Sequence, residues 1–276
     1  MLRKNYIFIL GGSLLVLILI IILAVRLGSG GDESSNAQPD TAAGIEYLRQ
    51  LEAQDPAEVD EELKYLHQQR LIEMRDERLR QLESGEISVW SLFEDYVLLG
   101  DSRAVGFYYF DFLPESRVLA ESGATIRNLE EHIPDIVKLN PSMLFLCYGL
   151  NDVSIGIWST PEEYAEEYAD IIAEIRKELP DVSIYISSIL PARDPAFEQS
   201  SAWYDIPQYS AAVEAMCEEN GCYYVDNDAL AEEYADLWEV DGIHVQKDFY
   251  PHWAANMIAE VYSSQLEEAD ADNLSA

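Results

Sequence analysis

The chain has 276 residues, of which 49% are hydrophobic and 25% are charged, and this balance excludes both a disordered and a collagen-like protein. Asp and Glu total 52 against 17 Lys and Arg, which gives a formal net charge of -35 at pH 7. A chain this acidic carries no basic stripe with which to bind phosphates, so nucleic acid is excluded as a partner.

The first 27 residues predict a membrane anchor. No charged residue lies between Asn5 and Val25, and as a helix this apolar run is long enough to cross a hydrocarbon core of about 30 Å. No convincing small-x-small cleavage site follows, which favours an uncleaved signal anchor over a cleaved signal peptide. Because Arg3 and Lys4 precede the span, the positive-inside rule places the rest of the chain outside the cytoplasm. We therefore expect a single-pass protein of the cell membrane with an extracytoplasmic domain.

Residues 28–90 are predicted to form a linker and a helical stalk. Gly, Ser, Asp and Asn are abundant in residues 28–43, a composition typical of a flexible linker. Residues 44–84 are highly charged and carry leucines at three- or four-residue separations, which indicates one helical face. These leucines are Leu48, Leu51, Leu63, Leu66, Leu79 and Leu82. Pro56 divides the segment into a short and a longer helix. The apolar stripe is thin, so a lone or domain-packed helix is favoured over a coiled coil.

Residues 91–276 alternate short apolar runs with helical stretches. Strands are predicted at residues 96–99, 117–119, 143–148, 182–190 and 222–225, and helices at 104–110, 126–139, 161–179, 207–220 and 251–266. Continuous apolar runs suit strands that are buried on both faces. Their alternation with helices predicts a five-stranded parallel sheet covered on both sides. In such folds the ligand site lies beyond the carboxyl ends of the strands.

Polar residues that suit nucleophilic catalysis follow these strand ends. Ser102 comes directly after the first strand, and Asn151 comes after the third. Near the carboxyl terminus, Asp241 and His244 lie three residues apart. A serine nucleophile needs a base to take its proton, and the base needs an acid to fix its tautomer. Ser102, His244 and Asp241 suit these three roles. The amides of Ser102 and Gly123, with the Asn151 side chain, suit an oxyanion hole.

Together these residues resemble the SGNH, or GDSL, hydrolase superfamily. The matching blocks are Gly100-Asp101-Ser102, Gly123, Gly149-Leu150-Asn151-Asp152 and Asp241-Gly242-Ile243-His244. They span nearly all of the domain at 91–276 and none of the anchor or stalk. The resemblance implies a three-layer α/β/α flavodoxin-like fold and a serine hydrolase that acts on esters with no metal or organic cofactor. It also implies that Ser102 is the nucleophile, His244 the general base and then acid, and Asp241 its orienting partner. Ser102, Gly123 and Asn151 would form the oxyanion hole.

Other catalytic motifs are absent from the sequence, and two features are left open. There is no Gly-x-Ser-x-Gly elbow, no His-Glu-x-x-His and no phosphate loop. Arg103 replaces the apolar residue that is common after the serine, and it either contacts substrate or pairs with an acid. The three cysteines fit no zinc pattern. Cys147 is expected to be buried in a strand, whereas Cys217 and Cys222 flank a corner at which an extracytoplasmic setting permits a disulfide.

The loops after the third and fourth strands are expected to set specificity. They carry Trp158, Phe197, Trp203 and Tyr204, whose rings either stack on sugars, line an acyl groove or pack the loops onto the domain. The acidic surface favours a neutral ester such as an O-acetylated glycan. The leading hypothesis is a membrane-anchored esterase that removes short acyl groups, in particular acetyl, from carbohydrate. The alternatives are an O-acyltransferase with the same triad and a catalytically silent cell-surface binding module.

Overall fold

The structure is a computed structural model that describes residues 84–274 continuously, with side chains to residue 265. Before residue 84 it describes residues 63, 65–66, 69–70, 72–74, 76–77 and 80–82, all of which are helical. The side chains of Leu63 and Leu66 are exposed there, whereas Leu82 packs against the domain. No helix in these described ranges is long and apolar enough to cross a membrane. The predicted anchor at 1–27 and the predicted linker lie outside them.

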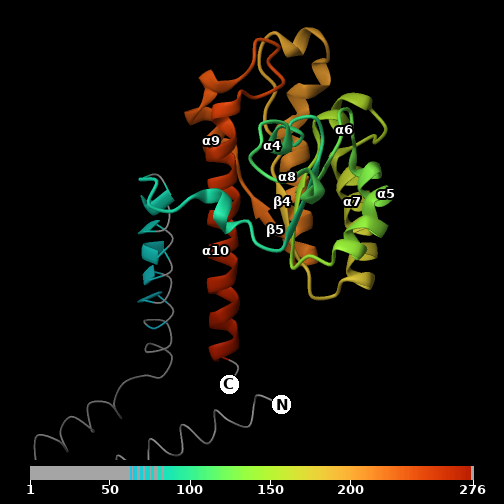
Figure 1. The fold of residues 1–276 in the computed structure, drawn as a ribbon. Coiled ribbons are helices and arrows are strands. Elements are labelled where there is room, and N and C mark those ends of the chain that lie inside the picture. Colours follow the sequence, from blue (N-terminus) through green and yellow to red (C-terminus); the bar gives the residue numbers. More distant parts are fainter. Residues whose placement is uncertain are drawn as a thin grey trace, which may run out of the picture. The chain divides into compact units, whose positions relative to one another are not determined.

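The five predicted strands form one parallel sheet, as expected (Figure 1). The strands are β1 (Tyr96–Gly100), β2 (Val118–Ala120), β3 (Met143–Cys147), β4 (Ser183–Ser187) and β5 (Tyr223–Val225). Their order is β2-β1-β3-β4-β5, and every neighbouring pair is parallel. This is the flavodoxin-like order. The direction in which successive strands are added reverses between β1 and β3, and ligands bind at this switch point. The nucleophile turn and the asparagine block follow these two strands.

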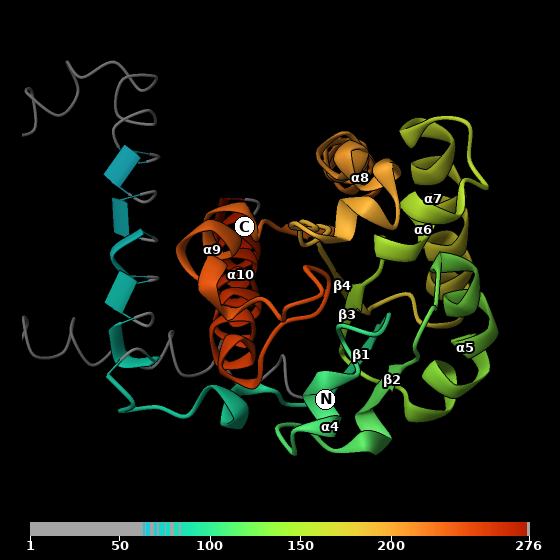
Figure 2. The same ribbon diagram turned by 90° about the horizontal axis from the view of Figure 1, so that it is seen from above.

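Helices cover both faces of the sheet, because alternate strand residues are apolar on each face. The α-helices are α4 (Gly106–Tyr109), α5 (Ile126–Leu139), α6 (Leu150–Ile155), α7 (Pro161–Glu178), α8 (Ile206–Asn220), α9 (Asp228–Glu233) and α10 (Tyr250–Leu274). Val97, Leu144 and Ile184 face α5, α7 and α8, whereas Leu98 and Phe145 face α10. Figure 2 shows α10 on one side of the strands and α5, α7 and α8 on the other. The predicted three-layer arrangement is therefore confirmed for the described domain.

Short 3-10 helices complete the described chain. They are η1 (Val89–Leu92), η2 (Glu115–Arg117), η3 (Ala196–Glu198), η4 (Ser201–Asp205), η5 (Ala235–Leu237) and η6 (Lys247–Phe249). Val89 of η1 is already buried in the core on the α10 side of the sheet.

Two differences from the sequence prediction lie at the functional edge of the sheet. The fourth strand ends at Ser187 rather than at residue 190. At this end the Asn227 amide donates to the Ser188 hydroxyl at 2.9 Å, and the Asn227 side chain donates to the Ser187 hydroxyl at 2.8 Å. Helix α6 was not predicted. It starts at once after β3 because Gly149 has a φ of 127°, and a β-carbon there would lie 2.4 Å from the Ile189 side chain.

Candidate active site

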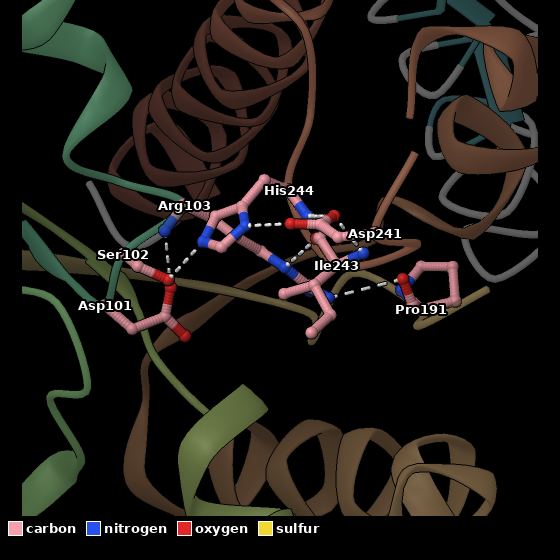
Figure 3. A network of polar contacts seen from close by, with 7 residues as sticks. All are labelled: Asp101, Ser102, Arg103, Pro191, Asp241, Ile243 and His244. Atoms are coloured by element: carbon pink, nitrogen blue, oxygen red, sulfur yellow. Dashed lines mark hydrogen bonds and ion pairs between the residues drawn. The ribbon is translucent and has the colours of Figure 1, made fainter. Parts of the chain in front are cut away.

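Ser102, His244 and Asp241 form a hydrogen-bonded series at the carboxyl edge of the sheet (Figure 3). The Ser102 Oγ lies 3.0 Å from His244 Nε2, and His244 Nδ1 lies 2.7 Å from Asp241 Oδ2. The structure thus brings together two segments that are 142 positions apart in the sequence. Both distances are within hydrogen-bond range, so a proton can pass from the serine to the imidazole without rearrangement.

The surroundings of Asp241 keep it ionised and thereby fix the histidine tautomer. Partial burial opposes ionisation, but hydrogen bonds from the His244 ring and from the amides of His244 and Ile243 outweigh it and lower the pKa of Asp241 below its ordinary value. The two amides donate to Oδ1 at 2.9 and 2.8 Å. An ionised carboxylate only accepts hydrogen bonds, so His244 Nδ1 carries the ring proton. Nε2 is then free to accept the proton of Ser102.

Local turns hold the members of this series in place. Ser102 lies in a tight turn after β1, in which the Asp101 Oδ1 accepts the Arg103 amide at 2.9 Å. Asp241 and His244 belong to a hairpin that is closed by an antiparallel bridge between Trp238 and Val245. Within this hairpin the Glu239 amide donates to the His244 carbonyl at 2.8 Å.

The sequence predicts an oxyanion hole made of three donors, the amides of Ser102 and Gly123 and the side chain of Asn151. In the described part of the chain, neither the Ser102 amide nor the Gly123 amide has a hydrogen-bond acceptor. Gly123 has a φ of 80°, a left-handed backbone conformation that glycine adopts without strain. The Asn151 Nδ2 donates to the Ala124 carbonyl at 2.9 Å, which leaves its second N–H available. Preplaced donors of this kind stabilise a developing oxyanion.

We expect Asn151→Ala to lower kcat for ester hydrolysis by about 10²- to 10³-fold, because one oxyanion donor is lost. The measurement is steady-state hydrolysis of nitrophenyl acetate by the purified chain. Asn220→Ala is the matched control, since Asn220 also donates to a carbonyl, that of Met216, at the far end of α8. An Asn151 variant with the turnover of the Asn220 variant would show that Asn151 only shapes its turn.

Sequence reasoning missed the burial of two acids in the motif blocks. Asp152 is fully buried, and its Oδ1 accepts the first amide of α5, that of Ile126, at 2.9 Å. Burial raises the pKa of Asp152 to about 7, and the charge of the nearby Asp101 adds to this rise. Burial likewise raises the pKa of Asp101 above its ordinary value. The only feature of the sequence that could have indicated these buried acids is their position, since Asp101 adjoins Ser102 and Asp152 adjoins Asn151. Asp152 fixes the start of α5, and with it the segment that carries Gly123.

The raised pKa of Asp152 makes stability depend on pH. The folded chain holds this proton at pH values where the unfolded chain has lost it, so the stabilisation fades as pH rises from about 4 to about 7. Asp152→Asn cannot ionise at this position. We therefore expect its free energy of unfolding, relative to that of the natural chain, to be about 2 kcal/mol higher at pH 8 than at pH 5.5. Urea unfolding at both pH values measures this difference. Asp170→Asn, at an exposed acid of α7, is the control. An equal difference at both pH values would contradict the assignment.

The two cations near the predicted oxyanion hole are held by other groups of the protein. The Arg103 side chain is 3% exposed and donates to backbone carbonyls, so it neither reaches the surface nor pairs directly with an acid. Arg127 is paired with Glu167 through two contacts of 2.6 and 2.9 Å and lies over the Trp158 ring. The ion pair with an acid, one of the two interpretations that the sequence left open for Arg103, is thus not formed among the described residues, and the carbonyls of Leu190, Pro191 and Ile243 take its donors instead.

Most of the predicted rim aromatics pack the loops onto the domain. Trp158 is buried and donates to Glu167 at 2.7 Å, and Trp203 is buried and donates to the Leu150 carbonyl at 2.8 Å. Tyr204 is 63% exposed, and its ring stacks on Phe197 with centroids 4.0 Å apart. One free aromatic face therefore remains, on a segment that packs against the helix of Asn151.

The cysteines are free thiols, so the disulfide that the sequence permits between Cys217 and Cys222 is not formed. Cys147 is buried in β3, as expected. Within the described residues, no group of three or more His, Cys, Asp or Glu side chains is placed to hold a metal ion.

A serine, a histidine and an aspartate in hydrogen-bonded series at the carboxyl edge of a parallel sheet are the arrangement of a serine hydrolase. The chain belongs to the GDSL-like lipase/acylhydrolase family, whose model matches residues 98–250. It is therefore an esterase or acylhydrolase, and the resemblance drawn from the motif blocks is confirmed.

Two solved structures share the fold at low sequence identity, and a third shows a weaker similarity. A lipase/acylhydrolase from Enterococcus faecalis has a TM-score of 0.51 and 16% identity, over 62% of this chain and 97% of that one. A putative GDSL-like lipase from Parabacteroides merdae has a TM-score of 0.50 and 20% identity, over 62% and 95% of the two chains. An acetylxylan esterase from Geobacillus stearothermophilus has a TM-score of 0.44 and 20% identity, over 61% and 94%. No curated protein matches the sequence significantly.

Proposed function

We propose that Ser102 is the nucleophile of a two-step ester hydrolysis. Its Oγ forms a bond to the ester carbonyl carbon while its proton passes to His244 Nε2. The carbon–oxygen bond to the alcohol then breaks, and the alcohol leaves with the proton from His244. Water next attacks the acyl-serine carbon and gives a proton to His244; the carbon–Oγ bond breaks, the acid leaves, and His244 returns the proton to Ser102. The observation that carries this proposal is the Ser102–His244–Asp241 series at 3.0 and 2.7 Å.

A binding module without activity has no use for this geometry. The amides of Ser102 and Gly123 have no acceptor among the described residues, which leaves both available to an oxyanion. Two buried acids hold the turns that carry these donors, at the energetic cost of keeping Asp152 protonated up to neutral pH. We therefore favour catalysis over a silent surface module.

The preferred acyl group is short, with acetyl as the leading candidate. The support is the acidic surface, which favours a neutral ester such as an O-acetylated glycan over an anionic lipid. We expect kcat/KM to fall along the series nitrophenyl acetate, butyrate and octanoate. Highest kcat/KM for octanoate would replace this proposal with a long-chain lipase.

Carbohydrate is the proposed carrier of the acetyl group. The exposed face of Tyr204 is suited to stacking on a sugar ring, and the net charge of -35 disfavours anionic substrates. The test is release of acetate from an acetylated oligosaccharide, with and without a free sugar acceptor. Acetate release in both supports an esterase. Transfer to the acceptor that exceeds release would identify an O-acyltransferase instead.

We also propose that an uncleaved anchor at 1–27 holds the domain on the outer side of the cell membrane. The support is the uncharged run from Asn5 to Val25, preceded by Arg3 and Lys4. The test is extraction of membranes with alkaline carbonate, followed by protease treatment of intact cells. Retention in the membrane with external cleavage supports the proposal, and release of the full chain by carbonate contradicts it.

A further inference from the structure

Arg103, the residue after the nucleophile, has an unusual environment for a cation. Its side chain is 3% exposed, and burial lowers the pKa of its guanidinium to about 10, so it remains charged at neutral pH. Placing a charge in the interior is costly unless its donors are satisfied. A residue that served only to fill space here would be apolar, so the contacts of this guanidinium need a reason.

Those contacts join three backbone segments around the serine (Figure 3). Arg103 Nε donates to the Ile243 carbonyl at 2.9 Å. Nη1 donates to the carbonyl of Leu190, and Nη2 contacts that of Pro191 at 3.4 Å. The planar guanidinium therefore links the nucleophile turn to the loop after β4 and to the Asp241–His244 loop. The Arg103 carbonyl in turn accepts the Tyr250 hydroxyl at 2.8 Å, which fixes the backbone from the α10 side.

The contact with Ile243 acts on the peptide unit that carries the histidine. The carbonyl of this unit accepts from Arg103, and its amide, that of His244, donates to Asp241 Oδ1 at 2.9 Å. The peptide plane is thus held at both ends. Because the imidazole projects from the next α-carbon, the direction of this plane sets where His244 Nε2 lies relative to the serine oxygen.

We propose that Arg103 is a positioning residue, which fixes the Ile243–His244 peptide so that His244 Nε2 stays within hydrogen-bond reach of Ser102 Oγ. This inference rests on the proposed role of Ser102 and His244. Arg103 touches neither substrate nor the reacting atoms, and it acts through the backbone. The apolar residue common at this position in the superfamily has no donor for these carbonyls. In this chain, therefore, the residue after the nucleophile helps to position His244, the general base.

The test compares three variants of the full chain for nitrophenyl acetate hydrolysis and for melting temperature. We expect Arg103→Met to lower kcat by about 10²-fold, the loss that a misplacement of roughly 1 Å produces, with KM changed less than about threefold. Arg103→Lys should lose about tenfold in kcat, because an ammonium keeps the charge but cannot bridge several carbonyls. Arg176→Met is the matched control, since Arg176 also binds backbone carbonyls, those of Asn220 and Gly221. It should lower the melting temperature and leave kcat unchanged.

The lysine variant decides the outcome if the methionine variant does not fold. A fall in kcat of more than about fivefold in Arg103→Lys, with KM and melting temperature near those of the natural chain, supports the proposal. A smaller fall, or a fall equal to that of the Arg176 control, overturns it. Ser102→Ala in the same assay separates the two claims. If it is inactive while both Arg103 variants match the natural chain, only the positioning role fails, and if it is active, the proposed function fails.

Discussion

Ser102→Ala should lower the rate of ester hydrolysis by about 10⁴- to 10⁶-fold, since it removes the atom that forms the acyl bond. The residual activity would come from the oxyanion donors and from binding. The measurement is hydrolysis of nitrophenyl acetate at neutral pH by purified variants with matched melting temperatures.

Ser159→Ala is the control for the serine replacement. Ser159 is exposed and lies outside the hydrogen-bonded series, so its variant should keep the natural rate. A Ser102 variant that retains more than about one tenth of the natural rate would rule out Ser102 as the nucleophile.

Asp241→Asn should lower kcat by about 10⁴-fold while leaving the loop folded. The asparagine oxygen can keep both backbone amides that Asp241 Oδ1 now accepts, at 2.8 and 2.9 Å. Its NH₂ group would then face His244 Nδ1, which must become an acceptor. The ring proton moves to Nε2, and the imidazole can no longer take a proton from Ser102.

Asp226→Asn is the matched control for Asp241. The Asp226 Oδ1 also accepts an amide two residues ahead, that of Asp228, at 2.8 Å, but it faces no histidine. Its variant should keep the natural kcat. If both asparagine variants retain full activity, Asp241 does not orient His244.

The sheet and the triad could be predicted because each rests on a local signal. Strands such as β3 are continuous apolar runs that fit only a sheet buried on both faces. Ser102 and Asn151 each follow the end of a strand, and parallel strands bring their carboxyl ends to one edge. The Asp241–His244 pair lies in a hairpin before the last helix and was found through its motif.

The remaining features depend on contacts between distant segments, which the sequence does not display. Asp152 looks like an ordinary surface acid, and its burial follows only from its bond to the amide of Ile126. In the sequence Trp203 looks like an aromatic residue of the cleft rim, but its indole N–H donates to the Leu150 carbonyl. Arg103 could have faced substrate, and the carbonyls that bind it lie 87 and 140 positions away.

The central claim is that His244 activates Ser102, and covalent labelling tests it most directly. The full chain would be treated with a fluorophosphonate, and the modified residue identified by peptide mass. We predict one adduct per chain, on Ser102, with labelling absent in Ser102→Ala and strongly slowed in His244→Ala. An adduct on another residue, or labelling of Ser102→Ala at the natural rate, would contradict the account.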